Sequence, residues 1–150
     1  MSAISNITVF DGAATPVSHT LAAISVERDK GVLTAKWREQ IASLPTEAQI
    51  YAILTIQKSR AGTVISTFEV GVPVMESIAG NNASGYTAAP KVAYVDKNVW
   101  TSYAHPRSNI TGRRLAKQLL SNISNNISTS VAAATAGVFD ELVAQLVGPT

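Results

Sequence analysis

The sequence predicts an α+β fold with an N-terminal β-hairpin, an antiparallel sheet of about five strands and two C-terminal helices. Apolar residues alternate with polar ones in short segments through the first two thirds of the chain, as in strands with one covered face. Turn residues separate these segments. After Pro106 the apolar residues recur every four positions, which is typical of amphipathic helices. The order predicts helices packed on one face of the sheet.

The N-terminal part predicts a hairpin over residues 1–26, with Asp11-Gly12 as its turn. The charged residues 27–31 predict a second turn before a strand at 32–38. Residues 37–44 suit either a strand end or a short helix, because their apolar residues also have helical spacing, and Pro45 ends either structure.

The clearest strand covers residues 49–58, followed by a turn at 59–62 and a return strand at 63–72. Side chains alternate along a strand, so this strand has an apolar face and a mixed face. The apolar face carries Ile50, Ala52, Leu54 and Ile56. The mixed face carries Tyr51, Ile53, Thr55 and Gln57.

Residues 27–107 therefore hold the main sheet. A long loop rich in Gly and Asn interrupts it at residues 76–90. A last strand is expected at 91–105, with a break at 96–98.

Residues 108–150 predict two helices separated by a Ser- and Asn-rich stretch at 121–130. Ser108 or Thr111 is expected to cap the first helix, and Gly148-Pro149 to end the second. The first apolar stripe consists of Leu115, Leu119, Ile123 and Ile127. The second consists of Val131, Val138, Leu142 and Leu146.

The composition indicates a single domain, residues 1–150, that hides surface against copies of itself. Hydrophobic residues make up 46% of the chain and charged residues only 15%. There is no cysteine, which excludes disulfides and thiolate metal sites. No signal peptide and no apolar stretch of membrane-spanning length is recognisable, so we expect synthesis in the cytoplasm and no membrane partner.

Positive charge is concentrated in the middle of the chain. Residues 28–117 hold all 12 Lys and Arg residues but only six of the ten acidic residues. This stretch is suited to contact with a polyanion, although ordinary scatter of surface charge is an equally good explanation.

Catalytic patterns are not recognisable in the sequence. His19 and His105 lack metal-ligand spacing, and no Gly-rich phosphate loop occurs. Asp140 and Glu141 are adjacent on a helix and are better explained by solubility than by paired acid–base chemistry. We therefore expect neither enzymatic activity nor a cofactor or metal.

Three short motifs carry a resemblance to a known family. Trp100-Thr101-Ser102-Tyr103 resembles a Trp-x-Ser-Tyr stretch, and Val70-Gly71-Val72-Pro73 resembles a Val-x-Val-Pro strand ending. Lys36-Trp37 resembles an acid–Trp pair with the charge reversed. With the order of elements, these motifs resemble the levivirus-type coat proteins of single-stranded RNA bacteriophages over nearly the whole chain. The 76–90 loop and the C-terminus are longer than in that family, and the RNA-facing positions are less basic.

The resemblance implies a structural capsid protein found in the virion. Homodimers would join their sheets edge to edge, with the helices of each subunit packing across the partner. Dimers would then assemble into an icosahedral T=3 shell around single-stranded viral RNA. An RNA hairpin would be bound as a packaging signal or translational repressor, with Tyr103 at the position where the family stacks an aromatic ring on a base.

These considerations give three sets of candidate site residues. The RNA-binding set is Thr55, Gln57, Lys58, Arg60, Thr67, Tyr103, His105 and Arg107. The dimer-interface set is Leu115, Leu119, Ile123, Ile127, Val138 and Leu142. The set for contacts between dimers is Asn81, Asn82 and Tyr86.

Two other functions remain open on the sequence. A tail-tube or pilus-like subunit would share the low charge and the Ser, Thr and Ala content. A dimeric RNA-binding regulator would share the RNA surface but would not assemble. Particle shape separates these alternatives from a coat protein.

Overall fold

The computed structural model describes residues 3–76, 91–129 and 131–150. Its centre is one antiparallel sheet whose six strands follow one another in sequence order. They are β1 (Ile7–Phe10), β2 (Ser18–Asp29), β3 (Val32–Glu39), β4 (Tyr51–Lys58), β5 (Val64–Met75) and β6 (Val92–Ala104). The α+β class is confirmed. The sheet has six strands rather than about five because the N-terminal hairpin pairs with it through β2 and β3.

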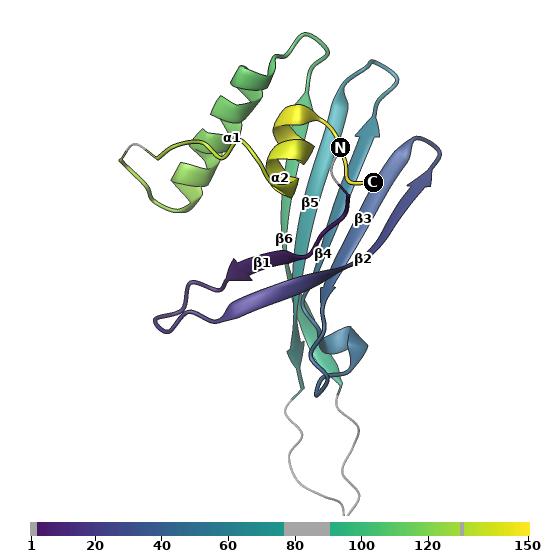
Figure 1. The fold of residues 1–150 in the computed structure, drawn as a ribbon, viewed down its shortest axis with the longest axis vertical. Coiled ribbons are helices and arrows are strands. Elements are labelled where there is room, and N and C mark those ends of the chain that lie inside the picture. The colour runs from purple at the N-terminus through teal and green to yellow at the C-terminus, as the bar shows by residue number, and fades with distance from the viewer. Residues whose placement is uncertain (1–2, 77–90, 130) are drawn as a thin grey trace, which may run out of the picture.

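The hairpin is turned across the main sheet. The pairing of β2 with β3 shifts by one residue between Ala23 and Ser25, which marks a β-bulge. A bulge bends its strand. Figure 1 shows β1 and the first half of β2 running across the direction of β3–β6.

The strand ends differ from the predictions in two places. β2 continues to Asp29, and only Lys30 and Gly31 form the turn; both have positive φ, 46° and 82°, as a tight hairpin turn requires. β6 is continuous from Val92 to Ala104, so the predicted break at 96–98 is wrong. These residues pair with residues 70–72 of β5, and pairing overrides their weak strand preference.

The alternative for residues 37–44 is also resolved. β3 ends at Glu39, and a short 3₁₀ helix, η1 (Thr46–Ala48), follows Pro45. The predicted loop residues Asn81, Asn82 and Tyr86 lie outside the described residues.

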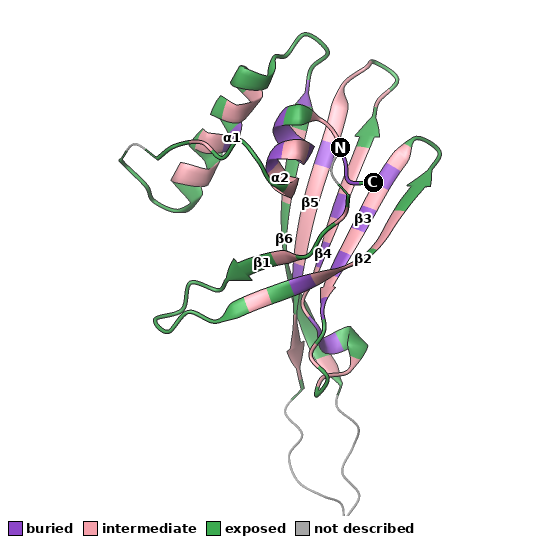
Figure 2. Ribbon diagram, in the orientation of Figure 1, coloured by how far each residue is buried: buried purple, intermediate pink, exposed green. Residues whose placement is uncertain are grey.

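The hydrophobic core lies on one face of β3, β4 and β5. Leu54 and Ala52 are fully buried there, and Trp37 donates its indole N–H to the carbonyl of Ser5 at 2.8 Å. Leu142 and Val143 of the C-terminal segment complete the core. Buried positions accordingly gather on the sheet beneath this segment, as Figure 2 shows.

The C-terminal region contains one long and one short helical segment. α1 (Ile110–Ser124) is capped by Asn109, whose side-chain oxygen accepts from the Gly112 N–H at 2.7 Å, so neither predicted cap is used. α2 (Val138–Asp140) continues into η2 (Glu141–Gln145), one turn of π-helix. Leu146 then adopts a left-handed conformation, with φ 59°. The second helix is thus much shorter than the stripe beginning at Val131 predicted.

Candidate functional site

Helix α1 faces its own chain with charged residues and faces outward with apolar ones. Lys117 is buried, and Arg113 and Arg114 are partly buried. Leu119 and Ile123, in contrast, are 54% and 75% exposed. In Figure 1 the helix lies beside the sheet, beyond β6, rather than over its centre. The predicted stripe exists, but its own sheet does not cover it.

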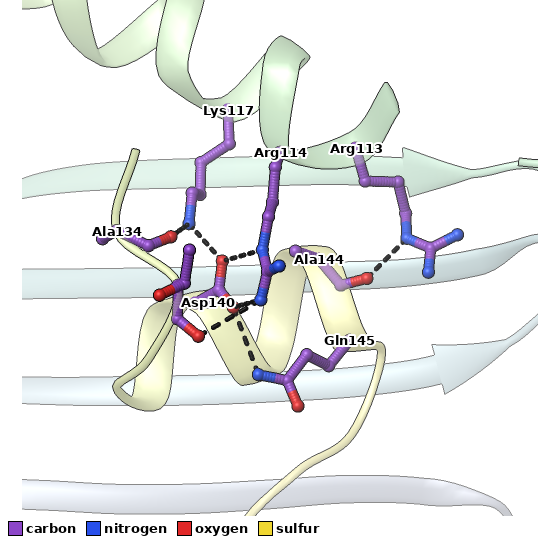
Figure 3. Close-up of polar contacts among 8 residues, drawn as sticks. Arg113, Arg114, Lys117, Ala134, Asp140, Ala144 and Gln145 are labelled. Carbon is purple, nitrogen blue, oxygen red and sulfur yellow. Dashed lines mark hydrogen bonds and ion pairs between the residues drawn. The ribbon is translucent and has the colours of Figure 1, made fainter. Parts of the chain in front are cut away.

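Asp140 of α2 holds α1 in this orientation. It is 1% exposed, and its carboxylate accepts from the Nε and Nη2 of Arg114 at 3.1 and 2.7 Å. The Lys117 ammonium and the Gln145 side-chain amide donate to the same carboxylate. Figure 3 shows these groups converging on Asp140 between α1 and the C-terminal segment. We call Arg114, Lys117 and Asp140 the ion cluster.

The basic side chains of α1 also donate to backbone carbonyl groups of the C-terminal segment. Lys117 Nζ donates to the Ala134 carbonyl at 2.9 Å, and Arg114 Nη2 to the Thr135 carbonyl at 3.1 Å. Arg113 Nε donates to the Ala144 carbonyl at 2.6 Å. The irregular stretch at 131–137 is therefore tied down by side chains of α1, which explains how it stays in place without forming a helix.

Hydrogen bonds from Arg114 hold the pKa of Asp140 well below its ordinary value of 3.8, although burial acts in the opposite direction. The same pair raises the pKa of Arg114. Asp140 and Arg114 thus remain charged at neutral pH. Sequence reasoning assigned Asp140 to solubility and missed this role. Its one sequence signal was a carboxylate next to the apolar pair Val138-Phe139, within a segment that has few charges.

The predicted dimer-interface residues divide into two groups. Leu115, Leu119, Ile123 and Ile127 are exposed. Leu142 is 1% exposed in the core of its own chain, and Val138 packs against that core. Placing Leu142 at an interface is therefore a mistake: its side chain has no surface to offer a partner.

The free edge of β6 adjoins the exposed helix. β6 pairs only with β5, so its other edge is open over 13 residues within the described part of the chain. A hollow of about 230 Å³ separates this edge from α1 and is lined by Trp100, Ala104, Ala116 and Leu120 among others. The open edge and the apolar side of α1 thus form one continuous surface.

The sheet face opposite the core holds four of the eight predicted RNA-binding residues. Thr55 pairs with Thr67, and Gln57 pairs with Ile65, which in turn pairs with Tyr103. Tyr103 is 73% exposed. These four predicted residues therefore share one face, which we call the open face.

The remaining predicted RNA-binding residues lie at the rim of the open face. Lys58 is the last residue of β4, and the alternation of side chains assigns it to the core face rather than to the open face. Arg60 lies in the β4–β5 turn. The chain turns after β6, because the Ser108 N–H donates to the His105 carbonyl at 2.8 Å. Arg107 donates its N–H to the His105 ring and does not continue the row of Tyr103.

The acidic residue Glu69 of the open face is neutralised by its neighbours. Lys97 lies 3.0 Å from its carboxylate, and the Tyr51 hydroxyl donates to it at 3.2 Å. The pKa of Lys97 is raised mainly by this hydrogen bond with Glu69. Glu69 therefore repels a polyanion less than the sequence indicates.

Two features are absent from the described residues: a metal-binding cluster and a membrane-spanning helix. No group of three His, Asp or Glu side chains there has a metal-binding arrangement. None of the helices described is long and apolar enough to cross a membrane.

Comparison with known proteins gives matches in structure. The chain matches a virus-like particle of bacteriophage EMS014 with a TM-score of 0.73, 28% sequence identity and 99% of both chains covered. It matches the bacteriophage EMS014 coat protein with a TM-score of 0.66 and 29% identity, over 95% of this chain and 85% of that one. The chain has the fold of a bacteriophage coat protein.

More distant matches share this coat-protein fold. A virus-like particle of bacteriophage NT-214 is 19% identical, with a TM-score of 0.63 and 98% of both chains covered. No protein-family model and no curated protein sequence matches the chain. The resemblance to levivirus-type coat proteins is confirmed by these structures, and the motifs that carried it lie on β3, β5 and β6.

Replacing Asp140 tests the ion cluster. Asp140→Asn leaves Arg114 and Lys117 without their counter-charge, so it should lower the free energy of unfolding by about 3–5 kcal/mol in urea titrations at neutral pH. Asp29→Asn, at an exposed strand end, is the matched control and should change it little.

The stabilisation that Asp140 provides should depend on pH in a defined direction. The pKa of Asp140 is lower in the folded state than its ordinary value of 3.8. Its contribution to the free energy of unfolding is therefore complete above pH 3.8 and is lost as the pH falls further towards the folded pKa. The difference between wild type and Asp140→Asn should be constant from pH 8 to 5 and shrink only below pH 3.8. A difference that already shrinks around pH 6 would contradict the assignment.

Proposed function

We propose that the chain is a structural capsid subunit whose homodimers assemble into an icosahedral shell around single-stranded viral RNA. The observation that carries this proposal is the surface formed by the exposed apolar side of α1 and the open edge of β6. A soluble monomer seldom leaves a row of large apolar side chains wet along a helix. The coat-protein matches support the same role.

The geometry favours a two-fold dimer built on β6. Two copies of an open antiparallel edge can pair with each other, which removes both exposed edges at once. Because α1 lies beyond β6, it then extends over the partner's sheet. Leu115, Leu119 and Ile123 would pack there, and the hollow between β6 and α1 would be filled by the partner.

The open face is the proposed RNA surface. The segment formed by α2 and η2 packs on the opposite face of the sheet, and in the dimer the partner's α1 would cover more of that face. A shell can therefore direct the open face towards its interior. Tyr103 offers an exposed ring for stacking on a base, and Gln57 and Thr55 offer hydrogen-bonding groups beside it. The proposed role is binding and packaging without catalysis. Binding of one RNA hairpin as packaging signal or repressor is part of the proposal.

The proposed location is the virion, after assembly in the bacterial cytoplasm. A T=3 arrangement requires one sequence to occupy several environments, and we propose that Asn81, Asn82 and Tyr86 of the 76–90 loop mediate contacts between dimers. A tail-tube subunit or a non-assembling regulator would share the dimer. Neither is favoured by the coat-protein matches.

Leu119→Asp tests the dimer. Leu119 is exposed within one subunit, so the variant should still fold. In the dimer the carboxylate would be desolvated, at a cost of several kcal/mol, and dimers and particles should be lost in size-exclusion chromatography. Thr111→Asp is the control: it adds the same charge to the first turn of α1, where the helix dipole favours it. Normal particles from Leu119→Asp would rule out this interface.

Tyr103→Ala and Lys58→Ala test the RNA surface. Loss of the ring should remove about 1–3 kcal/mol of stacking and reduce preference for the phage's own replicase-start hairpin. Loss of Lys58 should weaken binding to all RNAs alike and lower the salt dependence. Lys91→Ala, an exposed lysine at the opposite end of the sheet, is the control for charge. Wild-type RNA content and affinity in both variants would place the RNA surface elsewhere.

A further inference from the structure

A second hollow lies on the open face, away from Tyr103. It has a volume of about 380 Å³, within the range of small-ligand sites. Strands β2, β3 and β4 contribute Ile24, Lys36, Arg38, Tyr51 and Ile53, and η1 contributes Glu47 as part of a wall. None of the candidate RNA-binding residues lines it.

A glycine on β5 shapes the surface beside this hollow. Gly71 pairs with Tyr51, and a side chain at Gly71 would collide with the Tyr51 ring. The ring therefore lies over the backbone of β5, where its hydroxyl reaches Glu69 and Lys97 lies 5.9 Å from the ring centre. Because Tyr51 leans towards β6, the space above Arg38 and Ile53 stays open.

The ion pairs in and around the hollow do not include Arg38. Glu27 pairs with Lys36 at 3.1 Å, and Glu69 pairs with Lys97 at 3.0 Å, so these four charges offset one another. The Arg38 side chain makes no ion pair or hydrogen bond with any described residue, and its Nε is buried. A buried N–H without an acceptor is unfavourable, and the Nε itself is out of reach of an outside molecule. Arg38 is only partly buried, so the rest of its guanidinium can donate to an acceptor from outside the subunit.

We propose that this hollow binds one nucleotide of single-stranded RNA, with a phosphate oxygen accepting from the Arg38 guanidinium. Arginine presents a fork of donors that matches phosphate. Ile24 and Ile53 give the base an apolar floor, and the Glu47 carboxylate can accept from an N–H of the base. Glu47 also weakens the local positive potential, so Arg38 must provide the phosphate contact itself.

The position of the hollow favours RNA over a protein carboxylate as its occupant. Tyr51 and Gln57 lie six residues apart on β4 and share the open face, a separation of about 20 Å at roughly 3.3 Å per residue. One short RNA segment can therefore contact both the Tyr103 platform and this hollow. The inference rests on the proposed function, because it requires RNA on the open face.

Ultraviolet cross-linking of purified wild-type particles tests the proposal. After nuclease digestion, mass spectrometry maps the nucleotide adducts that remain on the protein. We expect adducts within residues 36–53 in addition to those at Tyr103. Particles that contain RNA but give adducts only outside residues 36–53 would overturn the inference and leave the proposed function standing. Particles without RNA would overturn both.

Arg38→Gln provides the matched comparison, with Lys30→Gln as a control that removes one positive charge at the β2–β3 turn. Arg38→Gln should reduce the adducts within residues 36–53 at least about fivefold and leave particle yield and Tyr103 adducts unchanged. Arg38→Lys keeps the charge without the fork and should give an intermediate loss. Loss of particles in Arg38→Gln alone would identify a contact between subunits and overturn the RNA assignment. If that variant does not fold, the wild-type map decides.

Discussion

The Asp140 carboxylate, buried between Arg114 and Lys117, determines how the C-terminal half of the subunit is arranged. An amphipathic helix usually buries its apolar side against its own sheet. Here the inward side of α1 is charged, and the only way to satisfy that side is to face Asp140 and the carbonyl groups around it. The leucine and isoleucine side chains of α1 must then point away from the subunit.

Attaching a helix through a buried ion cluster has an unfavourable desolvation free energy, because the charges lose their hydration. The cluster nevertheless makes the orientation of the helix specific. Apolar contacts would tolerate several rotations of α1, whereas a bidentate Arg114–Asp140 pair permits few. We infer that the ion cluster keeps the apolar side of α1 available for a second copy of the chain. The strand order has the same consequence, because it leaves the outer edge of β6 unpaired beside the helix within the described part of the chain.

Much of the sheet was predictable from the sequence, because the side-chain period of a strand is a local property. The alternation in residues 49–58 and in the return strand 63–72 identified the two faces of β4 and β5. It placed Thr55, Gln57 and Thr67 on the face that Tyr103 shares. The break predicted at Asp96-Lys97-Asn98 was wrong because its local signal took no account of pairing with β5 and of the Lys97–Glu69 ion pair.

The helical region was less predictable, because helical spacing shows that a stripe exists but not what covers it. Leu119 and Leu142 both belong to a predicted apolar stripe, yet Leu119 is exposed and Leu142 is in the core. From the sequence alone Asp140 is predicted to be a surface residue. Its role depends on Arg114, which is 26 residues earlier in the chain and contacts it only in the folded structure. The hollow at Arg38 depends on the tilt of Tyr51 over Gly71, which no spacing pattern reveals.

We propose that this chain alone contains the contacts needed to build a closed shell. The decisive measurement is electron microscopy of a bacterial lysate in which only this chain is expressed. We expect roughly spherical particles of uniform size. Tubes, or a soluble dimer that never assembles at high concentration, would show that the proposal is wrong.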